Sequence, residues 1–164
     1  MSTTIQKPVH VNQKQFLVKS FRDVALLQKA IANCHFVTKE KIQISVLEKC
    51  KSPIADDVKL CSEQFQHLKK VLHKEFGTKA KSGFFFNPEI GTIFCIGNLS
   101  PIFLQEIDGK PLGAIGTGVH GIIRGLGTKK EKVEALVKAL TNGDYLLFIS
   151  ARASAIEALK QNIK

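Results

Sequence analysis

The residues that come closest to a chemical motif lie in the segment 109–127, GKPLGAIGTGVHGIIRGLG, where seven of nineteen residues are glycine. Gly116, Gly118 and Gly121 have the spacing G-x-G-x-x-G, in which a glycine-rich turn holds a phosphate at a helix N-terminus. That motif needs a hydrophobic strand before it and an acidic residue about 20 residues after it. Neither flank fits, because KPLGAI is no strand and Glu131 is too near. The spacing therefore indicates no nucleotide cofactor.

A second pattern in the same segment is a step of four residues. Small residues recur at this interval, which places them on one face of an α-helix. They are Gly109, Gly113, Gly121 and Gly125. A face of small residues allows a second backbone to approach closely. We therefore predict a glycine-rich helix over 109–127 that packs closely through these four glycines.

His120 and Arg124 lie four residues apart in this predicted helix, so their side chains share a face. An imidazole beside a guanidinium is suited to hold an anionic group, and the pair is a candidate anion contact. The alternative interpretation is that the two polar side chains extend beyond a closely packed helix interface and bind no anion. We predict no catalytic residue and no metal site, since the four cysteines and five histidines show no nucleophile motif and no ligand spacing.

The net charge of +10, from 24 basic and 14 acidic residues, is the most informative total. Lysine excess produces a diffuse positive field that attracts polyanions, whereas specific base recognition favours arginine, of which there are three. A basic patch lies close in sequence to three consecutive phenylalanines, and lysines beside aromatic rings suit single-stranded nucleic acid. The patch consists of Lys69, Lys70, Lys74, Lys79 and Lys81. The alternative interpretation is a solvated lysine face.

Hydrophobic periodicity predicts the elements that position these residues. Residues 15–48 are predicted to form a strand, a helix and a parallel strand, either adjacent or with one strand between them. Residues 57–76 are predicted as a helical insertion, and 77–89 as a loop. Two more strands are predicted at 91–98 and 144–150. Without the insertion the order is βαβ–βαβ, so we predict an α+β fold with a ferredoxin-like split βαβ sheet and a glycine-rich helix.

The chain has the length of one domain, at 164 residues. Residues 1–13 are expected to be a disordered tail, and 14–164 a single domain. The cysteines have no C-x-x-C spacing, so we expect buried free thiols in a reducing compartment. They are Cys34, Cys50, Cys61 and Cys95. The N-terminal residues lack the apolar core of a secretory signal, which favours a cytoplasmic location.

No segment is predicted to span a membrane. The stretch Ile90–Leu104 has fifteen uncharged residues, whereas a spanning helix needs about 20 apolar ones. If the protein contacts a membrane, we expect the segment 90–123 to lie on its surface.

Three stretches cover most of the chain: FLVKSFRDVALLQKAIANCHFVTKEKIQISVLEK, PEIGTIFCIGNLSPIF and GVHGIIRGLGTKKEKVEALVKALTNGDYLLFIS. Together they resemble the small bacterial general or heat-induced stress proteins with a glycine-rich insert. The first is similar to that family's strand–helix–strand, the second to its apolar glycine-containing run, and the third to its glycine-rich helix and strand. This chain departs from the family at Thr128 and Lys129, where a proline-bearing start is usual, and in the insertion at 57–76.

The resemblance implies a stress-associated protein without established catalytic residues, from a family in which some members work near membranes. We therefore expect a non-catalytic, cytoplasmic bacterial protein without a cofactor, which self-associates as a scaffold through an apolar surface. The alternative is a basic module that binds nucleic acid or an acidic protein partner. A further alternative is a protein associated with a membrane surface.

Overall fold

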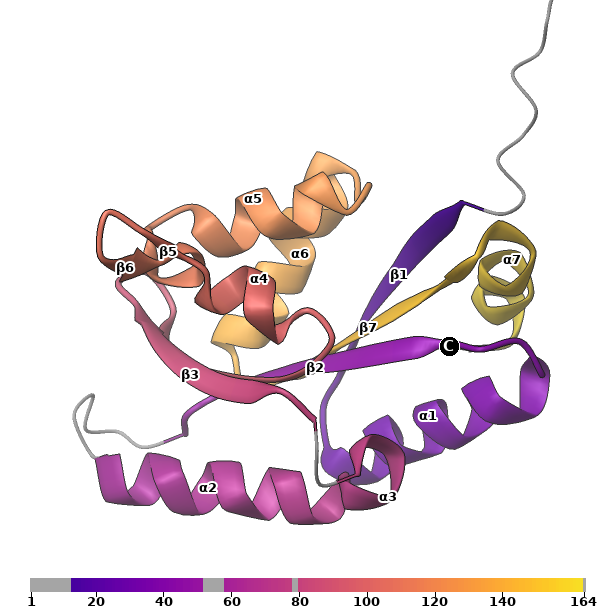
Figure 1. Ribbon diagram of the computed structural model, residues 1–164, viewed down its shortest axis with the longest axis horizontal. Helices are drawn as coiled ribbons and strands as arrows, with labels where there is room; N and C mark the ends of the chain where they lie inside the picture. The colour runs from indigo at the N-terminus through magenta and orange to yellow at the C-terminus, as the bar shows by residue number, and fades with distance from the viewer. Residues whose placement is uncertain (1–12, 52–57, 78–79, 164) are drawn as a thin grey trace, which may run out of the picture.

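An antiparallel sheet of five strands forms the centre of the computed structural model (Figure 1). The structure describes residues 13–51, 58–77 and 80–163. The strands lie in the order β1-β7-β2-β4-β3, and every neighbouring pair is antiparallel. Their bounds are β1 (Lys14–Phe21), β2 (Gln43–Lys49), β3 (Ser82–Asn87), β4 (Gly91–Gly97) and β7 (Tyr145–Arg152).

Helices cover both faces of this sheet (Figure 1). One layer contains α1 (Val24–Val37), α2 (Val58–Val71), α3 (His73–Phe76) and α7 (Ala153–Asn162). The opposite layer contains α4 (Ser100–Leu104), the 3-10 turn η1 (Leu112–Ala114), α5 (Gly118–Gly125) and α6 (Lys130–Thr141). A separate small hairpin is made by β5 (Glu106–Ile107) and β6 (Lys110–Pro111).

Strand β7 connects the two hydrophobic cores, because successive side chains of a strand point to opposite faces. Leu147 and Ile149 belong to the core under α1, α2 and α7. Leu146 and Phe148 belong to the core under α4, α5 and α6. The uninterrupted apolar run of this strand therefore reflects its burial on both faces.

The strand–helix–strand unit at the start of the chain is confirmed. Strands β1 and β2 are parallel to each other, and β7 lies between them, antiparallel to both. The α+β class is also confirmed, with five strands in the main sheet rather than four. The observed strand order does not establish the ferredoxin-like arrangement, which stays a prediction.

The prediction that residues 77–89 form a loop is wrong, because this segment contains β3, a strand that was not predicted. It pairs with β4 at the edge of the sheet, and Phe84 stands opposite Phe94. Its three phenylalanines alternate between the two faces: Phe85 is buried, whereas Phe84 and Phe86 are exposed. Because three consecutive phenylalanines are all apolar, the sequence does not show the alternation of apolar and polar residues that is typical of a strand.

The prediction of one glycine-rich helix over 109–127 is wrong. Gly109 follows Asp108 in the turn between β5 and β6, where both residues have positive φ, and Gly113 lies in η1. Of the four predicted glycines, only Gly121 and Gly125 lie in α5. A Cβ placed on either would meet no atom from another described element within 4 Å, so neither marks a close contact with such an element. The positive φ values at the turn break the helix that a four-residue step would require.

Gly113 and Gly118 are the glycines that approach their neighbours closely. A Cβ on Gly113 would stand 2.6 Å from ring atoms of Phe85, and a Cβ on Gly118 would overlap the carbonyl oxygen of Leu112. Close packing in this segment therefore joins η1 to β3 and the start of α5 to η1.

The insertion predicted at 57–76 is helical, but it forms α2 and α3 with a break at Leu72. Its apolar residues recur at helical spacing, and Cys61, Phe65, Leu68 and Leu72 are buried against the sheet. The predicted N-terminal tail, apart from residue 13, lies outside the described residues. Within the described chain, no helix has the length and apolar character that a membrane crossing requires.

Candidate functional site

A groove of about 500 Å³ lies beside α2, α3 and β4. We call it the α2 groove, and its lining residues are Gln66, Lys69, Lys70, His73, Gly77, Ala80 and Ile96. The end of α2 and the start of α3 supply its three basic side chains. Lys69 and Lys70 lie in the last turn of α2, and His73 begins α3. None of the described residues that line the α2 groove carries a carboxylate, so this lining is positive.

A continuous series of rings extends from this basic surface to the edge of the sheet. The ammonium group of Lys69 lies 5.4 Å from the centroid of the Phe65 ring. Phe65 stacks on Phe94 with centroids 4.7 Å apart and rings 9° from parallel. Phe94 meets Phe84 edge-on at 6.4 Å. We call Phe65, Phe94 and Phe84 the aromatic series.

The outermost ring of the aromatic series faces solvent. Phe84 is 58 % exposed, whereas Phe65 and Phe94 are buried beneath α2. Phe86, which is also exposed, projects from the same face of β3, two residues further on. Exposed rings beside fixed cations can stack on planar groups while the cations contact phosphates. The chemistry of this surface therefore suits a polyanion that carries rings.

The predicted basic patch is only partly gathered by the fold. Lys69 and Lys70 line the α2 groove, and Lys81 lines a neighbouring groove of about 590 Å³ that shares Ala80 with it. Lys74 is exposed on α3 but lines neither groove. Lys79 lies outside the described residues.

The fold also adds basic residues that the sequence did not indicate. His35 and Lys41, from the end of α1 and the approach to β2, line the same groove as Lys81. They lie about 40 residues before Lys81 in the chain, so only the tertiary fold brings these three together. His73 was adjacent to the predicted patch, and its helical spacing of four and three residues from Lys69 and Lys70 was the signal that could have included it.

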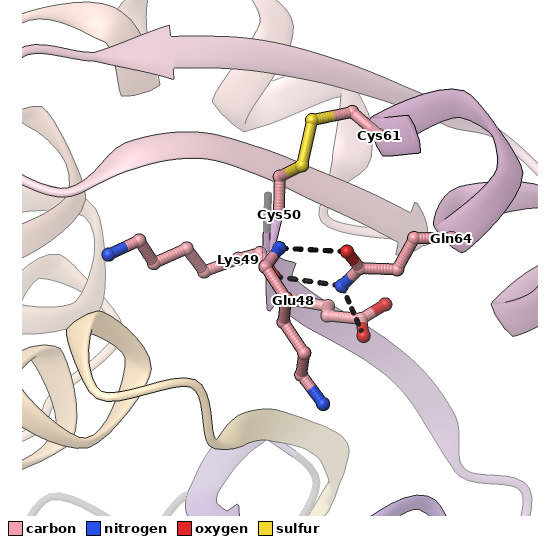
Figure 2. Close-up of a disulfide and its surroundings, with 6 residues drawn as sticks. Glu48, Lys49, Cys50, Cys61 and Gln64 are labelled. Carbon is pink, nitrogen blue, oxygen red and sulfur yellow. Dashed lines mark hydrogen bonds between the residues drawn. A yellow bond between two sulfur atoms is a disulfide. The ribbon is translucent and has the colours of Figure 1, made fainter. Parts of the chain in front are cut away.

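A disulfide attaches α2 to the sheet, which corrects the expectation of four free thiols (Figure 2). It joins Cys50, directly after β2, to Cys61 in α2, with Cα atoms 5.4 Å apart. Cys34 and Cys95 are free and buried, as expected. The two bonded cysteines are eleven residues apart, a spacing that has no recognised motif. Only the return of α2 over the end of β2 makes them neighbours.

Gln64 forms a second attachment, one turn after Cys61 (Figure 2). Its side-chain amide donates to Glu48 Oε1 at 2.7 Å and to the carbonyl oxygen of Lys49 at 3.0 Å. Its carbonyl oxygen accepts from the backbone N–H of Lys51 at 2.8 Å. The disulfide and this amide together fix α2, and hence its basic residues, relative to β2.

Glu48 is a buried acid at this attachment point, with 2 % of its surface exposed. Burial raises the pKa of its carboxyl group, and the hydrogen bond from Gln64 opposes that shift. Its Oε2 atom has no hydrogen-bond partner within the described chain. Burial also raises the pKa of the neighbouring Tyr145, and the charge of Glu48 raises it further. The carboxyl group therefore accepts a proton more readily than an exposed glutamate does.

The candidate anion contact, His120 and Arg124, lies in the opposite helical layer, on α5. Arg124 is exposed, and His120 is half-buried with an Nδ1 atom that has no hydrogen-bond partner in the described part of the chain. Neither residue lines the α2 groove. An anion contact at this pair stays a prediction. Among the residues that the structure describes, no group of three or more His, Cys, Asp or Glu side chains could hold a metal ion.

Comparison with known proteins gave no match. No protein-family model, no curated protein and no solved structure matches this chain. The resemblance to the stress-protein family therefore stays a prediction that depends on the three stretches quoted above.

Proposed function

We propose that this protein is a non-catalytic module that binds single-stranded nucleic acid across the α2 groove and the edge of the sheet. The observation that supports this proposal is the aromatic series, which connects the cation of Lys69 to the exposed ring of Phe84. Lys70 and His73 add positive groups along the same groove.

Each part of this surface has a separate role in the proposal. The phosphates contact Lys69, Lys70 and His73, and a base stacks on Phe84. Stacking of this kind contributes about 1–3 kcal/mol per base and tolerates any base, because every base has a flat face. Lysines contact phosphates as point charges and read little sequence. We therefore expect binding that depends weakly on nucleotide sequence.

Fluorescence anisotropy with a labelled oligothymidylate tests this proposal. We expect binding at about 50 mM salt that weakens steeply towards about 200 mM, because bound phosphates release their counterions. Failure to bind at low salt would overturn the proposal. Polyglutamate carries charge without bases, so it distinguishes an acidic protein partner. If it competes as well as oligothymidylate, the acidic partner is the better explanation.

Matched variants separate charge from stacking. The double variant Lys69→Gln/Lys70→Gln should reduce the salt slope by about 2, roughly one unit for each phosphate contact. Lys130→Gln/Lys132→Gln removes the same charge from exposed positions on α6, in the opposite layer, and should change the slope much less. Equal effects of the two pairs would show that net charge alone drives binding.

Phe84→Ala tests the stacking role. We expect it to weaken binding by about 1–3 kcal/mol while leaving the salt slope unchanged. Phe36→Ala is the matched control, because Phe36 on α1 is also highly exposed and belongs to neither groove. If both alanine variants bind like the parent protein, rings take no part in binding.

Self-association is the second candidate function, and the position of β3 favours it. This strand lies at the end of the sheet and carries Phe84 and Phe86 exposed on one face. An edge strand presents backbone groups that can pair with a second copy. Light scattering after size exclusion should then show a dimer that Phe86→Lys converts to a monomer. A protein that is monomeric throughout the accessible concentration range contradicts this candidate.

A further inference from the structure

A second cavity lies on the face of the sheet opposite the α2 groove. Its volume is about 190 Å³, and β1, β2, β7 and the turn after β4 contribute to its walls. Its lining includes Lys14, Phe16, Gln43, Leu99, Phe148 and Ser150. Phe148 belongs to the core under α4, α5 and α6, whereas Ile96 of the α2 groove belongs to the other core. The two sites are therefore separated by the sheet.

Ser150 is the polar centre of this cavity. It lies on β7, opposite Phe16 of β1 on one side and Gln43 of β2 on the other. Only 7 % of its surface is exposed, and its hydroxyl group has no hydrogen-bond partner in the described part of the chain. A buried hydroxyl without a partner is unfavourable, so an unused donor here indicates a place for a ligand atom.

Among the described residues, one charged side chain lines the cavity, and it is positive. Lys14 extends across β7, where its ammonium group donates to Gln43 Oε1 at 2.6 Å. No acidic side chain of the described ranges lines the cavity. A ligand with one negative charge is therefore favoured. An oxygen atom of this ligand can replace Gln43 Oε1 as the hydrogen-bond acceptor of the Lys14 ammonium group.

The remaining lining residues are three apolar side chains, which limit the size of the ligand, and the polar Ser45 and Asn98. Phe16, Phe148 and Leu99 enclose the space next to Ser150. An apolar cavity of about 150 Å³ is large enough for benzene. The volume of about 190 Å³ therefore has room for one ring and one small polar group.

We propose that this cavity binds a small aromatic monocarboxylate. Its carboxylate pairs with Lys14 and accepts a hydrogen bond from Ser150, and its ring lies against Phe16 and Phe148. The side-chain amide of Gln43, released from Lys14, turns its N–H groups towards the same carboxylate. This site does not depend on nucleic-acid binding at the α2 groove.

Amide NMR spectra of the full chain, titrated with benzoate, test this proposal. We expect saturable shifts at Phe16 and Ser150. Benzyl alcohol, a neutral probe of similar size, should bind about tenfold more weakly, because it cannot pair with Lys14. Absence of a saturable shift with benzoate, or equal binding of the two probes, would overturn the proposal.

Two variants assign the contacts. Lys14→Met should remove the preference for benzoate over benzyl alcohol, and Ser150→Ala should weaken benzoate binding about tenfold, the size of one hydrogen bond to a charged group. Lys129→Met, at an exposed position before α6, is the matched control and should leave both affinities unchanged. An unaltered benzoate affinity in Lys14→Met would contradict the proposed orientation and overturn the site.

Discussion

Glu48 has a carboxyl group that is more readily protonated than usual, because this residue is buried. It lies on β2 between the sheet and α2, and burial raises the pKa of its carboxyl group. Its hydrogen bond from Gln64 survives protonation, because only Oε1 accepts it. Protonation of Glu48 therefore affects the stability of the fold rather than the hydrogen bond that attaches α2.

The raised pKa of Glu48 predicts a specific pH dependence of stability. The folded state holds this proton more tightly than the unfolded chain, whose ordinary value is 4.5. The stability contributed by Glu48 is thus complete below pH 4.5 and is lost as pH rises through the folded pKa. Glu48→Gln removes the charge and keeps an oxygen for Gln64, so it should be more stable than the parent protein at pH 7.

Urea denaturation of both proteins between pH 4 and pH 8 measures this effect. The difference in unfolding free energy between the Glu48→Gln variant and the parent should grow with pH and then level off. Glu134→Gln, at an exposed position on α6, is the control and should give a difference that does not grow. A flat difference for Glu48→Gln would mean that the carboxyl group titrates normally.

Gly118 and Gly121, two glycines of the G-x-G-x-x-G spacing, differ in how they affect the stability of the fold. A Cβ on Gly118 would overlap the Leu112 carbonyl oxygen, and a backbone atom cannot move aside easily. Gly118→Ala should therefore lower the unfolding free energy by about 1–3 kcal/mol through overpacking. Gly121 has open space around its Cα, so Gly121→Ala should raise it by about 0.5–1 kcal/mol, because alanine loses less entropy in a helix.

Chemical denaturation of the two alanine variants checks this pair, and each serves as the control for the other. A destabilised Gly121→Ala would restore the idea that α5 packs closely through that face. A fully stable Gly118→Ala would show that η1 can move away from α5.

Among the elements, α2 depends most on specific attachments. It is joined to the end of β2 by the disulfide and by Gln64, and it carries the basic residues of the α2 groove. The free thiols do not compete for this bond at neutral pH. Burial raises the pKa of Cys34 to about 12 and that of Cys95 to about 11, so neither supplies the thiolate that exchange requires.

Reduction of the disulfide should therefore destabilise the protein and loosen α2. A cross-link that closes a short loop contributes about 2–4 kcal/mol, so dithiothreitol should lower the unfolding free energy by that amount. Hydrogen exchange should increase first in α2, and oligothymidylate binding should weaken. Cys50→Ala/Cys61→Ala is the control, since its stability should not respond to dithiothreitol. An equal response in both proteins would show that the reductant acts elsewhere.

At the scale of the whole molecule, the sheet separates two chemically different surfaces. The α2 groove and the exposed rings of β3 lie on one face, and the small cavity around Ser150 lies on the other. The net charge of +10 acts over both, and it favours anionic ligands at either surface. The two proposed ligands, a large polyanion and a small monoanion, would therefore occupy opposite faces of the sheet.

Binding to the folded state predicts a gain in stability of the whole molecule. Oligothymidylate at 100 times its dissociation constant should raise the unfolding free energy by about 2.7 kcal/mol, provided that the unfolded chain does not bind it. Thermal denaturation with and without the oligonucleotide measures this gain, which should vanish in high salt. An unchanged melting temperature under saturating conditions would indicate that the unfolded chain binds equally well.

The sequence by itself determined the elements whose signals are local. Periodicity identified α1, β2, β7 and the helical insertion that contains α2, because a helix or strand repeats its contacts at a fixed interval. It also placed Lys69 and Lys70 together, since neighbours on one helix stay neighbours in the fold. The local part of the candidate site was therefore predictable.

The tertiary structure decided everything that joins distant segments. The pairing of Cys50 with Cys61, the burial of Glu48 and the edge position of Phe84 all depend on where α2 and β3 pack. The cavity around Ser150 needs three strands and a turn from separate parts of the chain. Such contacts leave no periodic mark in the sequence, because chain closure and packing, rather than local geometry, bring their residues together.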